Sequence, residues 1–156
     1  MVYIVDTSSF IVLGHYFPDR FPSFWTHFDA LADAGRLISV REVWKELDNF
    51  NTKQHLAQWI AARKALFCTP TSEEMAFVAR IFEVPQFQAL VKKRNVLEGL
   101  PAADPWVVAA AAVRRGCVVT EEGRNPNQIR IPAVCKHFEV QCCALQEMMS
   151  REGWKY

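Results

Sequence analysis

The sequence lacks the signals of several common kinds of site. Its four histidines form no H-x-x-x-H pair or similar arrangement, so neither a histidine–metal site nor a histidine-activated nucleophile is indicated. It also lacks the glycine-rich motifs Gly-x-Gly-x-x-Gly and Gly-Lys-Thr, which hold nucleotide phosphates. The chain therefore gives no support to histidine-based chemistry or to nucleotide-dependent reactions.

Cysteine is present, but not in a pattern that holds a metal or a disulfide framework. The five cysteines are odd in number and include no Cys-x-x-Cys pair. Cys68 and Cys117 lie in apolar, strand-like runs, which is typical of buried thiols in a reducing cytoplasm. We expect free thiols and no zinc site, because the ligand spacing of zinc sites is missing.

An excess of one charge and long apolar runs are also missing. The formal net charge is +1, whereas a protein that binds nucleic acid by electrostatics alone is usually more basic. No apolar run approaches the ~20 residues needed to span a bilayer. The chain does not open with a basic segment followed by an apolar one, as a signal peptide does. We expect a soluble, cytoplasmic protein with no membrane contact.

What the sequence does contain is an alternation of short apolar runs and helix-like stretches. Apolar residues make up 51% of the chain, enough for a core, and the length suits one domain over residues 1–156. Strands that alternate with helices predict an α/β domain with a mainly parallel central sheet. Strands are expected at 2–5, 37–40, 117–120 and 138–142, with helices at 7–13, 24–32, 41–49, 55–65, 73–82, 105–115 and 144–151.

Carboxylates follow three of the expected strands within a few residues. Asp6 follows the first strand, Glu42 and Glu46 follow the second, and Glu122 follows the run 117–120. Strand ends of a parallel sheet share one edge, and ligands bind there. Asp104, which opens the alanine-rich helix, would lie beside the same edge. A cluster of carboxylates at such an edge predicts a site for a hard divalent cation.

Each of these acids also has a purely structural interpretation. Asp6 could cap the next helix, and Asp104 could be a helix N-cap with proline at the first helical position. Glu42 and Glu46 are four residues apart on one helix face and could form surface ion pairs. Glu122 could be a loop carboxylate, and the adjacent Glu121 competes with it for the metal role.

Basic residues near the acids are candidates for binding a phosphate backbone. Arg124 and Arg130 are the better placed, because they lie in the polar loop beside Glu122. The alternative is that these arginines serve solubility.

Taken together, these residues resemble the motifs of the PIN-domain family over nearly the whole length of the chain. The opening Val5-Asp6-Thr7-Ser8 is similar to the first acidic motif of that family, and three later segments resemble the second to fourth: Val43-Trp44-Lys45-Glu46-Leu47, Ala103-Asp104-Pro105-Trp106-Val107-Val108-Ala109 and Val118-Val119-Thr120-Glu121-Glu122. The second motif favours Glu46 over Glu42. The fourth position departs from the family, because it usually carries aspartate. The segment Ile131-Pro132-Ala133-Val134-Cys135 also looks like a poorly characterised PIN subfamily of bacteria and archaea.

The resemblance implies a three-layer α/β/α sandwich and a metal-dependent ribonuclease, most similar to the toxin of a VapC-like toxin–antitoxin pair. It implies that Asp6, Glu46, Asp104 and Glu122 hold one or two Mg²⁺ or Mn²⁺ ions. Thr7, Ser8 and Thr120 would tune the site through hydrogen bonds. The implied partners are an RNA substrate, a small antitoxin and a second copy in a homodimer.

Two other classes of protein remain open at this point. A PIN-like module that has lost activity could bind RNA or a protein partner, and the glutamate at position 122 supports it. A phosphoryl-transfer or receiver domain also places an aspartate after its first strand. Aspartyl phosphatases of the haloacid dehalogenase type, however, want a second aspartate two residues on, where this chain has Ser8.

Overall fold

The computed structural model describes residues 1–90, 102–123 and 130–156. Within these residues a five-stranded sheet has the order β3-β2-β1-β4-β5, and every neighbouring pair is parallel. The α/β class and the parallel sheet are thus confirmed. The strands are β1 (Tyr3–Val5), β2 (Leu37–Val40), β3 (Phe67–Cys68), β4 (Cys117–Val119) and β5 (Gln141–Cys143).

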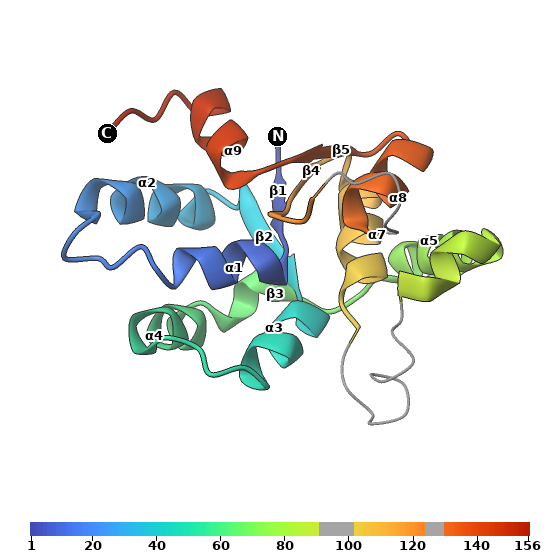
Figure 1. Cartoon of the computed structure of the whole chain (residues 1–156), viewed down its shortest axis with the longest axis horizontal. Helices are drawn as coiled ribbons and strands as arrows, with labels where there is room; N and C mark the ends of the chain where they lie inside the picture. The colour runs from blue at the N-terminus through green and yellow to red at the C-terminus, as the bar shows by residue number, and fades with distance from the viewer. Residues whose placement is uncertain (91–101, 124–129) are drawn as a thin grey trace.

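The helices cover both faces of the sheet, which makes the architecture a three-layer α/β/α sandwich. Helices α1, α2, α4 and α9 lie on one side of the sheet and α5, α7 and α8 on the other, while α3 follows β2 directly (Figure 1). In the described residues the helices are α1 (Thr7–Leu13), α2 (Pro22–Asp33), α3 (Arg41–Asp48), α4 (Gln54–Ala62), α5 (Ser72–Glu83), α7 (Asp104–Arg114), α8 (Ile131–His137) and α9 (Leu145–Arg151), with 3-10 turns η1 (Lys64–Leu66) and η2 (Pro85–Leu90).

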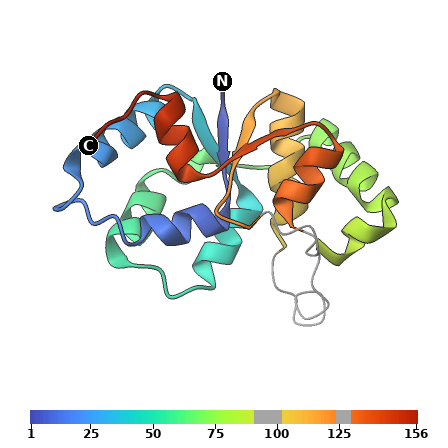
Figure 2. The same cartoon turned by 45° about the horizontal axis from the view of Figure 1, so that its top comes forward.

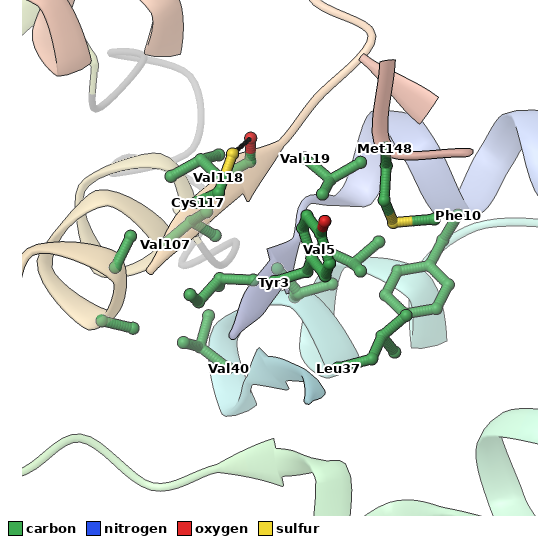
Figure 3. Close-up of a cluster of buried hydrophobic side chains, with 14 of the residues drawn as sticks. Tyr3, Val5, Phe10, Leu37, Val40, Val107, Cys117, Val118, Val119 and Met148 are labelled. Atoms are coloured by element: carbon green, nitrogen blue, oxygen red, sulfur yellow. Dashed lines mark hydrogen bonds between the residues drawn. The ribbon is translucent and has the colours of Figure 1, made fainter. Parts of the chain in front are cut away.

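The core has two halves, because successive side chains of a strand point to opposite faces of the sheet. On one face, Val5 and Leu37 lie near Phe10 of α1 and Met148 of α9, and on the other Val107 of α7 faces the strands (Figure 3). All of these side chains are buried. The central strands therefore consist of consecutive apolar residues, as expected for a sheet covered on both sides.

The strand order separates this fold from one of the alternatives. Flavodoxin-like domains, which include receiver domains, have the order 2-1-3-4-5. Here β1 lies between β2 and β4, and β3 forms an edge. The receiver interpretation is therefore wrong.

Several expected boundaries shift in the structure. Helix α2 begins at Pro22, before the expected start at residue 24, since proline is well tolerated in the first turn of a helix. The last strand begins at Gln141, not at Phe138, because α8 extends to His137 and Glu139 takes a left-handed turn with φ 57°. Thr71 caps α5, and its hydroxyl accepts a bond from the Glu74 amide at 3.2 Å.

Gly116 brings the end of α7 close to the first strand. A β-carbon added at this residue would lie 2.5 Å from the carbonyl oxygen of Val2 and 2.8 Å from Cδ1 of Ile4. Only glycine permits this approach without a shift of the backbone. None of the helices in the described part of the chain is long and apolar enough to cross a membrane.

Candidate functional site

The three strands that the candidate acids follow in the sequence are neighbours in the sheet. β2, β1 and β4 lie side by side at the centre of the sheet, so the residues that follow them emerge from adjacent strand ends. The amide of Asp6 donates to the carbonyl of Val119 at 2.9 Å and extends the pairing of β1 with β4 by one residue. The strand ends point away from the N-terminus, toward the starts of α1 and α3 (Figure 2).

Asp6 is the most buried acid of this edge. Its side chain is 2% exposed, and Oδ2 accepts hydrogen bonds from the hydroxyls of Ser8 (2.8 Å) and Thr120 (3.0 Å). The other oxygen, Oδ1, is buried and accepts no hydrogen bond of good geometry from any residue that the structure describes. Burial raises the pKa of Asp6 above its usual value, while the hydroxyls of Ser8 and Thr120 and the amides of Thr7 and Ser8 oppose that rise.

A helix cap does not explain Asp6. The residue occupies the N-cap position of α1, but its side chain makes no capping bond to the helix. The hydroxyls of Ser8 and Thr120 also lie 3.1 Å apart, so Asp6 belongs to a small network that joins β1 to the residue after β4. The capping interpretation accounts for the position of Asp6 but not for its contacts.

Glu46 of α3 turns toward the same edge. Its Oε1 accepts a bond from the amide of Ala103 at 2.8 Å, and its Oε2 accepts one from the hydroxyl of Thr7 at 3.3 Å. The pKa of Glu46 is raised to about 7, chiefly by burial; the negative charges of Asp6 and Glu122 add to the rise, and the two hydrogen bonds oppose it. Glu46 is therefore electrostatically coupled to two of the other predicted ligands.

Asp104 begins α7, but it is not the N-cap of that helix. The N-cap is Ala103, with φ −83° and ψ −27°, and Asp104 is the first helical residue, which places Pro105 one position later than expected. The N-cap prediction for Asp104 is thus wrong by one residue. A carboxylate in the first helical turn is still favoured by the helix dipole. Asp104 is partly exposed and follows the residue whose amide binds Glu46.

Glu122 and Glu121 point to different helices. Glu122 Oε2 accepts a bond from the amide of Ile131 at 2.9 Å, and Glu121 Oε1 accepts one from the amide of Leu145 at 2.7 Å. Glu122 is partly buried, and its own amide donates to the hydroxyl of Thr120 at 3.2 Å. Glu122 therefore stays connected to Asp6 through Thr120, whereas the side chain of Glu121 is committed to the start of α9.

Glu42 is held by its neighbour in the chain. Its side chain is buried and forms an ion pair with Arg41, with Nη2 and Oε1 3.0 Å apart. The pairing matches the structural interpretation of this residue, although Glu42 is not on a solvated face. Of the two candidate arginines, Arg130 is an exposed N-cap residue of α8, and Arg124 lies outside the described residues.

The donors fit a hard cation in their chemistry, but they are not gathered around one point. No group of three or more His, Cys, Asp or Glu side chains in the described ranges is close enough together to hold a metal ion. All candidate donors are oxygens, which Mg²⁺ and Mn²⁺ prefer. Oδ1 of Asp6, which no described residue binds, and the charges of Asp6 and Glu122, which help to raise the pKa of Glu46, are features that a bound cation would compensate.

The sequence did not predict that the backbone amides of Ala103 and Ile131 donate hydrogen bonds to the candidate ligands Glu46 and Glu122. Each lies at the start of a helix, where amides have no partner within the helix. The sequence signal that could have found them is a proline soon after a helix start, which occurs in both α7 and α8. Which carboxylate reaches each amide depends on tertiary structure and is not legible from local sequence.

Comparison with known proteins places the chain in a family. The profile of the family described as "Domain of unknown function (DUF4411)" matches residues 3–156. The chain belongs to the DUF4411 family. No curated protein matches this DUF4411 member in sequence.

Solved structures show what the DUF4411 fold is similar to. One similar structure is the crystal structure of VapBC2 from Rickettsia felis bound to a DNA fragment from the VapBC2 promoter. The matched chain is 13% identical to this one, with a TM-score of 0.52, and the match covers 92% of this chain and 98% of that chain. PAE2754 from Pyrobaculum aerophilum is 15% identical over 89% of this chain and 97% of that chain, with a TM-score of 0.37. The likeness to VapBC2 shows a PIN-like α/β fold, as the sequence motifs implied.

Proposed function

We propose that this DUF4411 protein is a divalent-cation-dependent endoribonuclease and the toxin of a VapC-like toxin–antitoxin pair. The observation that carries the proposal is the state of Asp6, a buried carboxylate at the end of the central strand, one oxygen of which has no hydrogen-bond partner among the described residues. The raised pKa of Glu46, to which Asp6 and Glu122 contribute, supports a shared site. The PIN-like fold supports it as well, since a crevice at the strand ends suits ligand binding.

In this proposal Asp6, Glu46, Asp104 and Glu122 hold one or two Mg²⁺ or Mn²⁺ ions. A bound cation supplies an activated water and neutralises the charge that develops on the phosphate. The hydroxyls of Ser8 and Thr120 orient the carboxylate of Asp6, and Thr7 does the same for Glu46. Arg130 and Arg124 bind the RNA backbone.

Cleavage of single-stranded RNA by Asp6→Asn protein tests the proposal. Asparagine keeps the size of the side chain and the acceptor for Ser8 and Thr120, but removes the charge, so the fold should persist while Mn²⁺-dependent cleavage is lost. Asp19→Asn is the matched control, because Asp19 is exposed and lies outside the network. Cleavage by Asp6→Asn protein at the parental rate, with contaminating nuclease excluded, would refute the role of Asp6.

We propose that the antitoxin, which would neutralise the ribonuclease, packs beside the acidic edge. Two adjoining cavities of about 470 and 190 Å³ share Leu47, Phe50, Asn51 and Thr52 as lining residues. Ile11 and Phe50, which line these cavities, are 44% and 55% exposed, so they offer apolar surface that a partner would cover. Helix α3 contributes both Leu47 of the cavities and Glu46 of the site, so one small protein could reach both. Co-purification of the protein with the product of a neighbouring gene in the native operon tests the antitoxin proposal.

We also propose that the protein forms a homodimer in solution, which sedimentation analysis tests.

A PIN-like module without activity is the second candidate function. The bond from the Ile131 amide to Glu122, and the lack of three gathered ligands in the described residues, both favour it. Mn²⁺ titration separates the two, because an inactive module predicts no binding at micromolar to millimolar concentrations. Saturable binding that Asp6→Asn abolishes would support the nuclease.

A further inference from the structure

Three glutamates near the acidic edge each bind a backbone amide at the start of a helix. Glu46 binds the amide of Ala103 before α7 at 2.8 Å, and Glu122 binds that of Ile131 in α8 at 2.9 Å. Glu121 binds the amide of Leu145 in α9 at 2.7 Å. The first two are proposed ligands of the cation, and the third is not. The chain thus contains two bonds of interest and one matched control.

The first two bonds hold separate parts of the chain together. The Glu46 bond joins α3 to the start of α7, 57 residues later in the sequence. The Glu122 bond closes the connection between β4 and α8. The longer side chain of glutamate, compared with the aspartate usual at this position, extends the reach of residue 122 toward that helix. The glutamate that replaces the aspartate of the PIN-domain motif therefore has a structural consequence, the bond to the start of α8.

We infer that cation binding at this edge weakens the hold of Glu46 and Glu122 on the starts of α7 and α8. The inference rests on the proposed function and adds a form of regulation to it. Negative charge makes a carboxylate a strong acceptor for an amide, and a cation that shares this charge reduces the strength of the bond. Arg130 is the N-cap residue immediately before Ile131, so the same change moves a proposed RNA contact. RNA affinity then depends on the cation separately from the cleavage step.

Amide hydrogen exchange of the full chain at pH 8, above the raised pKa of Glu46, with and without Mg²⁺, tests the inference by NMR. We expect exchange at Ala103 and Ile131 to become faster by about fivefold or more, as for a typical coupling between two sites. Exchange at Leu145 should stay unchanged. If Mg²⁺ binds, as shown by calorimetry, and the amides of Ala103 and Ile131 do not respond, or Leu145 responds equally, the coupling is wrong while the proposed function stands. If no cation binds at millimolar concentration, both fail.

Two neighbouring variants sharpen the experiment. Glu122→Gln keeps an acceptor oxygen for the Ile131 amide but loses the charge, so exchange at Ile131 should no longer respond to Mg²⁺. Glu121→Gln is the matched control and should keep the response at Ile131. A response at Ile131 that survives in Glu122→Gln, or one that disappears in Glu121→Gln, would overturn the inference.

Discussion

Replacing Glu46 with glutamine should stabilise the metal-free protein at alkaline pH. The pKa of Glu46 is raised from 4.5 to about 7 in the folded state, so the native protein retains a proton that the unfolded chain releases between these values. The free energy of unfolding therefore falls as pH rises from about 4.5 to about 7, and the loss is complete above that range. Glutamine stays neutral at every pH and avoids this loss.

The size of the effect follows from the rise in pKa. At about 1.4 kcal/mol per pKa unit, the rise amounts to roughly 3 kcal/mol. Because Glu46 is only partly buried, solvent screening reduces the expected gain to about 1–2 kcal/mol. For a chain of this size, that gain corresponds to a melting temperature about 2–8 °C higher at pH 8. At pH 4.5 or below the two proteins should differ little.

Thermal unfolding of both proteins between pH 4.5 and 8, in the presence of a chelator, measures this difference. Glu73→Gln serves as the control, because Glu73 is an exposed carboxylate in the first turn of α5. Its effect should show no comparable increase over this pH range. A stability gain for Glu46→Gln that does not increase between pH 4.5 and pH 8 would refute the raised pKa of Glu46 and its main cause, the burial of this carboxyl group.

Two further substitutions test other parts of the account. Gly116→Ala should lower the free energy of unfolding in urea by about 1–3 kcal/mol, because the new β-carbon would lie 2.5 Å from the carbonyl oxygen of Val2; a change within experimental error would mean that the backbone adjusts freely. Thr120→Val should weaken Mn²⁺ binding about 10- to 100-fold, because the hydroxyl that orients Asp6 is lost. Thr120→Ser keeps a hydroxyl and should bind Mn²⁺ nearly as well as the parent protein. Equal affinities for the two variants would exclude an orienting role for the Thr120 hydroxyl.

The fold was largely predictable because its elements carry strong local signals. The apolar runs at β1 and β4 and the alanine-rich segment of α7 each suit only one kind of element, and the structure contains them. The boundaries were less predictable. Asp104 followed by proline suits an N-cap and a first helical residue almost equally, and local sequence does not decide between them.

The sequence predicted that candidate residues follow neighbouring strands, but it did not predict their contacts. Asp6 and Glu46 emerge from neighbouring strands because parallel strand ends share an edge, which the alternation of elements implied. The bonds from Ala103 to Glu46 and from Ile131 to Glu122 depend on how helices pack and on a side-chain length, and neither follows from a motif. The fates of Glu121 and Glu122 differ for the same reason, although the two residues are adjacent in the sequence.

Anomalous diffraction from crystals grown with Mn²⁺ is the most direct measurement of the central claim. The account predicts a manganese peak beside Oδ1 of Asp6, within coordination distance of at least one more of Glu46, Asp104 and Glu122. A data set with manganese at other sites and none at Asp6, at a concentration that saturates binding in solution, would contradict it.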